Sequence, residues 1–174
     1  MRFRAEHRFG GPVDAVVALL TDPDFHRELQ LPDVSPPEVM AADVDGDDAH
    51  LQLRYEFVGS LDSIVTRLLG GRKLTWLQDL DLDRTTGKGR LRFAAEADPK
   101  RVHGKADFTI EPVDGNGGDG GNGGSGTTSV RRLSGELKVD VFPVGGMAER
   151  RIVPGLQRRL DIEAAELDRR LRSG

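Results

Sequence analysis

The chain has no cysteine among its 174 residues, which excludes disulfide bonds, thiolate metal sites and a cysteine nucleophile. Aromatic residues are few, with one tryptophan, one tyrosine and seven phenylalanines. No stretch approaches the roughly 18 to 20 apolar residues of a membrane span, so we expect no integral membrane contact. A cytoplasmic location follows as the default expectation.

Charge of one sign is not concentrated anywhere in the chain. The formal net charge is −4, and the 20 arginines and 5 lysines are dispersed among acidic residues. Because a nucleic-acid surface needs basic residues clustered against phosphates, we expect no nucleic-acid partner. With 37% hydrophobic residues, the length suffices for a single domain, residues 1–174, with a substantial core.

The N-terminal segment changes its hydrophobic period near residue 10. Residues 2–9 alternate, with Phe3, Ala5, His7 and Phe9 on one face, which predicts a half-buried strand. Apolar residues then recur at helical spacing from residue 13 to residue 20, behind a proline. An Asp-Pro pair at 22–23 opens a second short helix.

From residue 39 onward the period is mostly two. Apolar residues alternate with polar ones in six further segments, and turn residues separate these segments, for example at 45–48 and 85–89. Alternation on one side with short connections is typical of an antiparallel sheet with one solvated face. The sequence therefore predicts seven strands in all.

Two connections differ from simple hairpin turns. Residues 61–69 place apolar side chains at helical spacing before Gly70-Gly71, which predicts an amphipathic helix of about two turns. Residues 114–126 contain eight glycines and no apolar side chain, so burial cannot offset the entropy of ordering them. We expect a flexible hairpin loop there.

The C-terminal segment predicts one long helix with an apolar stripe, ending near Leu171. Pro154 lies within this pattern, although proline costs roughly 3 kcal/mol in a helix interior. Two interpretations stay open. Pro154 kinks the helix, so that the part before it roofs a ligand cavity, or Pro154 starts the helix and residues 144–153 form a linker.

The predicted element order is that of an α+β protein. A curved seven-stranded antiparallel sheet wraps around the long C-terminal helix, and two short helices follow the first strand. A strongly twisted sheet of this size curls, and one helix cannot fill the concave side from end to end. We therefore expect a cavity between the sheet and the helix.

Several local patterns resemble the START-domain-like helix-grip superfamily. They are "FRAEHRFGGPVDAVVALLTDPDFH" near the N-terminus and "VDVFPVGGMAERRIVPGL" before the last helix. This superfamily includes lipid-transfer domains, polyketide cyclase/dehydrases and birch-pollen-allergen-like proteins, and the chain looks like an uncharacterised bacterial branch of it. The resemblance implies a helix-grip fold that binds a hydrophobic or amphipathic small molecule.

The candidate ligand-binding residues are those that the alternation directs toward the concave side. His7 shares the face of Phe3 and Phe9, so its imidazole is a candidate for a ligand head group or for general-base chemistry. Gln78 and the Tyr55 hydroxyl are the other inward polar groups. The apolar candidates, which alternatively only fill the core, are Phe57, Trp76, Phe93, Phe108, Met147 and Ile152.

Metal and cofactor chemistry find no support in the sequence. The acidic run at 43–50 lacks the glycine and glutamate spacing of a calcium loop, and the four histidines form no HExxH pair. Asp79, Asp81 and Asp83 alternate along one strand. Folding the hairpin about residues 85–89 places Asp83 opposite Arg90 and Asp81 opposite Arg92, which indicates an exposed charge ladder rather than catalytic carboxylates. We expect no cofactor and no metal.

Three functions remain. The favoured one is a non-enzymatic module, monomeric or weakly dimeric, that binds or carries a fatty acid, an isoprenoid or a polyketide-like molecule. The second is a cyclase/dehydrase-like enzyme that uses His7 or Tyr55 in the same cavity. The third is a protein-interaction module that docks through the helix at 61–69.

Overall fold

The structure is a computed structural model that describes residues 1–60, 66, 72–113 and 128–173. The helix predicted at 61–69, apart from Thr66, and the glycine-rich loop predicted at 114–126 lie outside the described residues.

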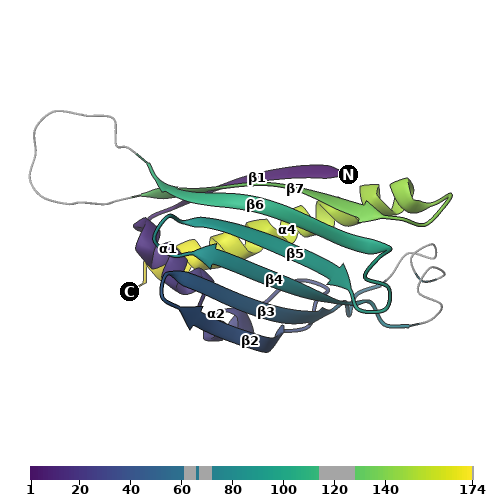
Figure 1. Cartoon of the computed structure of the whole chain (residues 1–174), viewed down its shortest axis with the longest axis horizontal. Coiled ribbons are helices and arrows are strands. Elements are labelled where there is room, and N and C mark those ends of the chain that lie inside the picture. The colour runs from purple at the N-terminus through teal and green to yellow at the C-terminus, as the bar shows by residue number, and fades with distance from the viewer. Residues whose placement is uncertain (61–65, 67–71, 114–127, 174) are drawn as a thin grey trace, which may run out of the picture.

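The central element is a seven-stranded antiparallel sheet with the strand order β1-β7-β6-β5-β4-β3-β2 (Figure 1). The N-terminal strand thus lies at one edge beside the last strand, and the other strands follow as a meander. The strands are β1 Arg2–Phe9, β2 Glu38–Asp45, β3 Asp48–Glu56, β4 Thr75–Asp83, β5 Lys88–Ala95, β6 Val102–Pro112 and β7 Ser129–Val139.

Three described helices accompany the sheet: α1 Val13–Leu20, α2 Pro23–Glu28 and α4 Gly145–Leu171. At the start of α2, the carboxylate of Asp22 accepts a hydrogen bond from the Asp24 backbone N–H at 2.9 Å, as the predicted cap requires. Within the described part of the chain, none of the helices combines the length and apolar character that crossing a bilayer requires.

Helix α4 crosses one face of the curved sheet, and its C-terminal end lies near α1 (Figure 1). It packs closely on β1, β7 and α1, at the β1 side of the sheet. The space that it leaves over β4 and β5 matters for the site described below. The predicted fold class, a curved seven-stranded sheet with its helices on one face, is confirmed.

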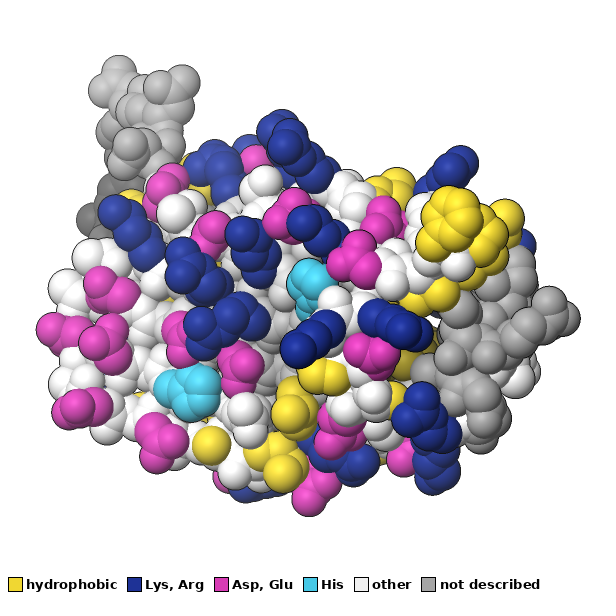
Figure 2. Space-filling view, turned by 45° about the vertical axis from the view of Figure 1, so that its right-hand side comes forward, with side chains coloured by type: hydrophobic (Ala, Val, Ile, Leu, Met, Phe, Trp, Pro, Cys, Tyr) yellow, Lys and Arg dark blue, Asp and Glu magenta, His cyan; other side chains and the backbone are white. Residues whose placement is uncertain are grey.

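The inward faces of the strands form the core as the alternation predicts. Strand β3 shows this most clearly, since Leu51, Leu53 and Tyr55 are buried and the residues between them are partly exposed. The outer face is solvated. Figure 2 shows basic and acidic side chains intermixed over much of the visible surface, while hydrophobic side chains gather at the right-hand end, where α4 begins.

Phenylalanine rings cover glycines on the inner face of the sheet. A Cβ atom built on Gly104 would lie 2.2 Å from the ring of Phe93, its direct partner on β5, and 2.7 Å from a backbone oxygen. Gly89 and Phe108 form the same kind of pair between the same two strands. Such pairs replace a missing side chain by a neighbouring ring and help to set the curvature of the sheet.

The hairpin between β4 and β5 has a different register from the predicted one. Asp81 lies opposite Arg90 and Asp79 opposite Arg92, two residues away from the predicted pairing, because the strands are joined by a tighter turn in which Gly87 has φ +66°. The predicted ladder of exposed charges is nevertheless present. Arg92 pairs diagonally with Asp81 at 2.7 Å, and Arg90 pairs with Asp107 on β6 at 2.8 Å.

Pro154 lies inside α4, which is continuous from Gly145 to Leu171. The interpretation in which Pro154 begins the helix and residues 144–153 form a linker is therefore wrong. Packing accounts for this, because Ala148 and Val153 are buried on the N-terminal side of the proline and stabilise helix there.

Candidate ligand-binding pocket

A pocket of about 350 Å³ lies between α4 and the sheet. Its wall on the sheet side comes mainly from β4 and β5, with Val102 of β6 and Leu137 of β7. Its wall on the helix side comes from residues 151–159, on both sides of Pro154. Because α4 packs along β1 and β7, this volume stays unfilled over the middle strands. The size falls at the lower end of the roughly 300–1,000 Å³ that small-molecule sites occupy.

Most of the pocket wall is apolar. Aromatic side chains come from the sheet and aliphatic ones from both the sheet and α4, so transfer of an apolar ligand body from water into the pocket is favourable. The main apolar side chains of the wall are Phe57, Trp76, Phe93, Leu137, Ile152 and Leu156.

One part of the wall is polar and buried. Arg159 on α4 is only 7% exposed, and its Nη2 donates a hydrogen bond to Oε1 of Gln78 on β4. Its guanidinium carbon lies 4.6 Å from the ring centre of Tyr55 and 6.0 Å from that of Trp76. Cation–π contacts of this kind favour the charged guanidinium in a dry environment.

Tyr55 lies behind this polar group rather than in the pocket wall. Its ring stacks on Trp76 with centres 5.3 Å apart and planes 12° apart, and the residue is 1% exposed. Burial raises the pKa of Tyr55 to about 12. Its hydroxyl has no hydrogen-bond partner among the described residues.

A second buried arginine pairs with a glutamate next to the pocket. Nη1 of Arg131 on β7 donates to Oε1 of Glu163 on α4 at 2.7 Å, and both side chains are at most 5% exposed. Burial alone would raise the pKa of Glu163, but nearby positive charges, that of the Arg131 guanidinium first among them, lower it below its ordinary value. Glu163 is therefore ionised in the folded protein.

His7 extends this ion pair to the surface. Its Nδ1 accepts a hydrogen bond from Nη2 of Arg131 at 3.3 Å, so Nε2 carries the proton that is donated to Asp161 at 2.9 Å. Burial and the charge of Arg131 lower the pKa of His7. The ring is thus neutral and fixed as a link between β7 and α4.

His26 on α2 is a second buried histidine, 1% exposed. Its Nε2–H donates to the backbone oxygen of Leu20 at 2.8 Å, and its Nδ1 has no partner within the described parts of the chain. Burial lowers the pKa of His26, so the ring is neutral near pH 7.

The structure brings five of the predicted ligand-binding residues together in the pocket wall. They are Phe57, Trp76, Gln78, Phe93 and Ile152. That they contact a ligand stays a prediction. Ile152 is on the part of α4 before Pro154, where the sequence predicted a roof over the cavity.

The other four predicted residues lie outside this wall. His7 is held by Arg131 and Asp161, Tyr55 lies beneath Trp76 and Arg159, and Phe108 packs over Gly89 in the core. Met147 is 46% exposed because α4 turns its neighbour Ala148 toward the protein interior.

Sequence reasoning missed Arg131, Arg159, Glu163 and His26. The sequence patterns of β7 and α4 carry signals for Arg131, Arg159 and Glu163. Arg131 occupies an inward position in the alternation of β7, two residues before Leu133, and Arg159 and Glu163 lie within the apolar stripe of α4 beside Leu160 and Ala164. A charged side chain inside an apolar pattern indicates a buried pair, because unpaired burial is costly. His26 carries no such signal.

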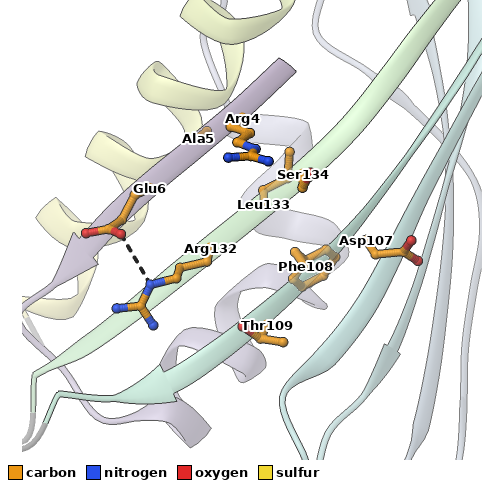
Figure 3. Close-up of a pocket in the computed structure, with 9 residues that line it drawn as sticks. All are labelled: Arg4, Ala5, Glu6, Asp107, Phe108, Thr109, Arg132, Leu133 and Ser134. Atoms are coloured by element: carbon orange, nitrogen blue, oxygen red, sulfur yellow. Dashed lines mark hydrogen bonds and ion pairs between the residues drawn. The ribbon is translucent and has the colours of Figure 1, made fainter. Parts of the chain in front are cut away.

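A second hollow lies on the outer face of the sheet across β1, β7 and β6 (Figure 3). Its polar side chains include Arg4, Asp107 and an ion pair between Arg132 and Glu6 at 3.2 Å. These side chains are mostly exposed and the hollow is open. Water therefore screens their charges, which would contribute little to the affinity for a ligand. The pocket beneath α4 is therefore the candidate site.

Replacing Glu163 by glutamine tests the buried ion pair. Glu163→Gln leaves Arg131 and Arg159 buried without a carboxylate, so we expect the free energy of unfolding to fall by about 3–5 kcal/mol. The matched control is Glu166→Gln on the same helix, which removes partly exposed pairs to Arg169 and Arg170 and should cost about 1 kcal/mol or less. Urea denaturation measures both, and equal losses would contradict the burial of the pair.

The pH dependence of stability follows from the buried histidines. Because the pKa of His26 is lowered on folding, the unfolded chain binds more protons below its ordinary pKa of about 6.5, so the free energy of unfolding falls as the pH falls below that value. His7 acts in the same direction. Each contributes at most about 1.4 kcal/mol per pH unit. His26→Gln keeps a donor but does not titrate, so thermal unfolding between pH 7.5 and 5.5 should show a shallower slope, and an unchanged slope would refute the assignment.

Comparison with solved structures finds the same fold over nearly the whole chain. The crystal structure of TTHA0849 from Thermus thermophilus has 18% identity and a TM-score of 0.63, covering 99% of this chain and 98% of that chain. The ZhuI aromatase/cyclase from Streptomyces sp. R1128 has 13% identity and a TM-score of 0.61, covering 99% and 93%. Ara h 8.0201 has 9% identity and a TM-score of 0.62, covering 100% and 99%.

At these identities the likeness shows a shared fold and not a shared function, and that fold is the helix-grip fold that the sequence predicts. A comparison with curated proteins found no match. Residues 4–171 match the family described as "Protein of unknown function (DUF2505)". The chain belongs to this DUF2505 family.

Proposed function

We propose that this protein binds or carries a hydrophobic or amphipathic small molecule in the pocket between α4 and the sheet. The observation that carries the proposal is the pocket of about 350 Å³ with a mostly apolar wall between α4 and the sheet. The presence of an aromatase/cyclase among proteins of the same fold supports the general kind of ligand.

The placement of two residues favours binding over catalysis. An enzyme of the cyclase/dehydrase kind would draw on His7 or Tyr55 for acid/base chemistry. His7 is engaged by Arg131 and Asp161, and Tyr55 is buried beneath Trp76 with a pKa raised to about 12. Neither group is positioned to exchange a proton with a molecule in the pocket.

The fluorescence of Trp76 reports on ligand binding, because Trp76 is the only tryptophan of the chain and lies in the pocket wall. The probe is N-phenyl-1-naphthylamine, a neutral apolar dye whose emission rises when it leaves water. We expect saturable binding, with energy transfer from Trp76 to the dye.

Two glycines of α4 give a matched pair of variants. Gly155 lies in the pocket wall, Gly146 lies outside it, and a Cβ atom built on either meets nothing within 4 Å. The Gly155→Leu side chain should occupy the pocket and weaken dye binding by about tenfold or more, a loss of about 1.4 kcal/mol. Gly146→Leu should bind like the parent protein.

Both variants should fold, because leucine has a higher helix propensity than glycine. Circular dichroism checks this. Absence of dye binding to the parent protein, or equal binding by the two variants, would contradict the proposed function.

A further inference from the structure

Arg159 is the one charged side chain, within the described residues, that is both buried and part of the pocket wall. It comes from the middle of α4, one residue before the buried Leu160, and its charge lies among apolar side chains. A guanidinium has five N–H donors and is always charged at physiological pH, so its surroundings must satisfy both the donors and the charge.

The protein satisfies the donors of Arg159 only in part. Nη2 donates to the neutral amide oxygen of Gln78, and Nε has no hydrogen-bond partner in the part of the chain that the structure describes. The rings of Tyr55 and Trp76 contact the face of the guanidinium. The N–H groups at its edge therefore stay available as hydrogen-bond donors.

The charge of Arg159 is not balanced by a direct ion pair. Glu163, the buried carboxylate nearby, forms its ion pair with Arg131 at 2.7 Å, and within residues 1–60, 66, 72–113 and 128–173 no carboxylate lies within ion-pair distance of Arg159. Two buried guanidinium groups and one buried carboxylate leave one positive charge in the interior. His26 adds none, because it is neutral.

Exposed charges of both signs also lie in the pocket wall, with Arg151 and Arg158 on α4 and Asp33 on the segment between α2 and β2. Because water screens exposed charges, the buried guanidinium of Arg159 is the charge that an acidic ligand group would meet in the pocket.

We propose that the pocket takes an amphipathic organic anion, whose carboxylate or similar acidic group binds the guanidinium of Arg159 while its apolar body lies against Trp76, Phe93 and Ile152. This inference rests on the proposed function and specifies its class of ligand. Guanidinium and carboxylate groups form paired hydrogen bonds, which would supply acceptors to donors that the protein leaves open. Gln78 positions the guanidinium by holding Nη2 from the sheet.

The test compares two ligands of equal chain length, decanoate and 1-decanol, as displacers of N-phenyl-1-naphthylamine. We expect decanoate to bind the parent protein roughly tenfold or more tightly than 1-decanol, as charge-assisted hydrogen bonds imply. In Arg159→Met, which keeps the length of the side chain without its charge, the two ligands should bind within about threefold of each other, a difference small beside that of one charge-assisted hydrogen bond.

Arg150→Met is the matched control, because it removes an exposed arginine of the same helix that lies outside the pocket wall and should keep the preference for decanoate. Equal affinities in the parent protein, or the same preference in Arg159→Met as in the parent, would overturn the assignment to Arg159. Failure of the neutral dye to bind would instead contradict the proposed function itself. If Arg159→Met does not fold, equal affinities of decanoate and 1-decanol for the parent protein would still overturn the proposal.

Discussion

The ion pair between Arg131 on β7 and Glu163 on α4 determines how the C-terminal helix lies on the sheet. Both groups are buried, and separating them would leave two uncompensated charges in the interior, so only one rotation and one axial position of the helix are favourable. That position places α4 along β1 and β7 and brings Arg159, one helical turn before Glu163, beside Gln78 on β4. The same contacts that hold the helix therefore leave the space over β4 and β5 open.

On the sheet side, the curvature of the sheet and the pairing of phenylalanine rings with glycines shape the pocket. Phe93 covers Gly104 on the neighbouring strand and also contributes to the pocket wall, so one ring stabilises the sheet and bounds the pocket. On the helix side, Gly155 lies in the pocket wall and has no side chain to fill the volume beneath α4. The apolar wall and the buried guanidinium are thus consequences of how one helix is fixed against one curved surface.

Most of the fold could be predicted because most strands signal their inward face by alternation, as β3 does with Leu51, Leu53 and Tyr55. The register of the β4–β5 hairpin could not, because turn residues indicate where a chain reverses but not which residues pair across it. In the site, alternation predicted most of the apolar residues of the pocket wall. His7 and Tyr55 also lie on the inner side of the sheet, but they contact Arg131 and Arg159 and do not line the pocket. Arg131, Arg159 and Glu163 were missed although each interrupts an apolar pattern, because such a pattern indicates that a charge is buried but only tertiary contacts show its partner.

A crystal structure of the protein with decanoate tests the central claim most directly, because it shows both the open volume and the group that recognises the ligand. We expect the carboxylate within about 2.7–3.0 Å of the guanidinium nitrogens of Arg159, with the alkyl chain running beside Trp76 and Phe93. A pocket filled by protein side chains, or a decanoate whose carboxylate lies away from Arg159, would contradict the account.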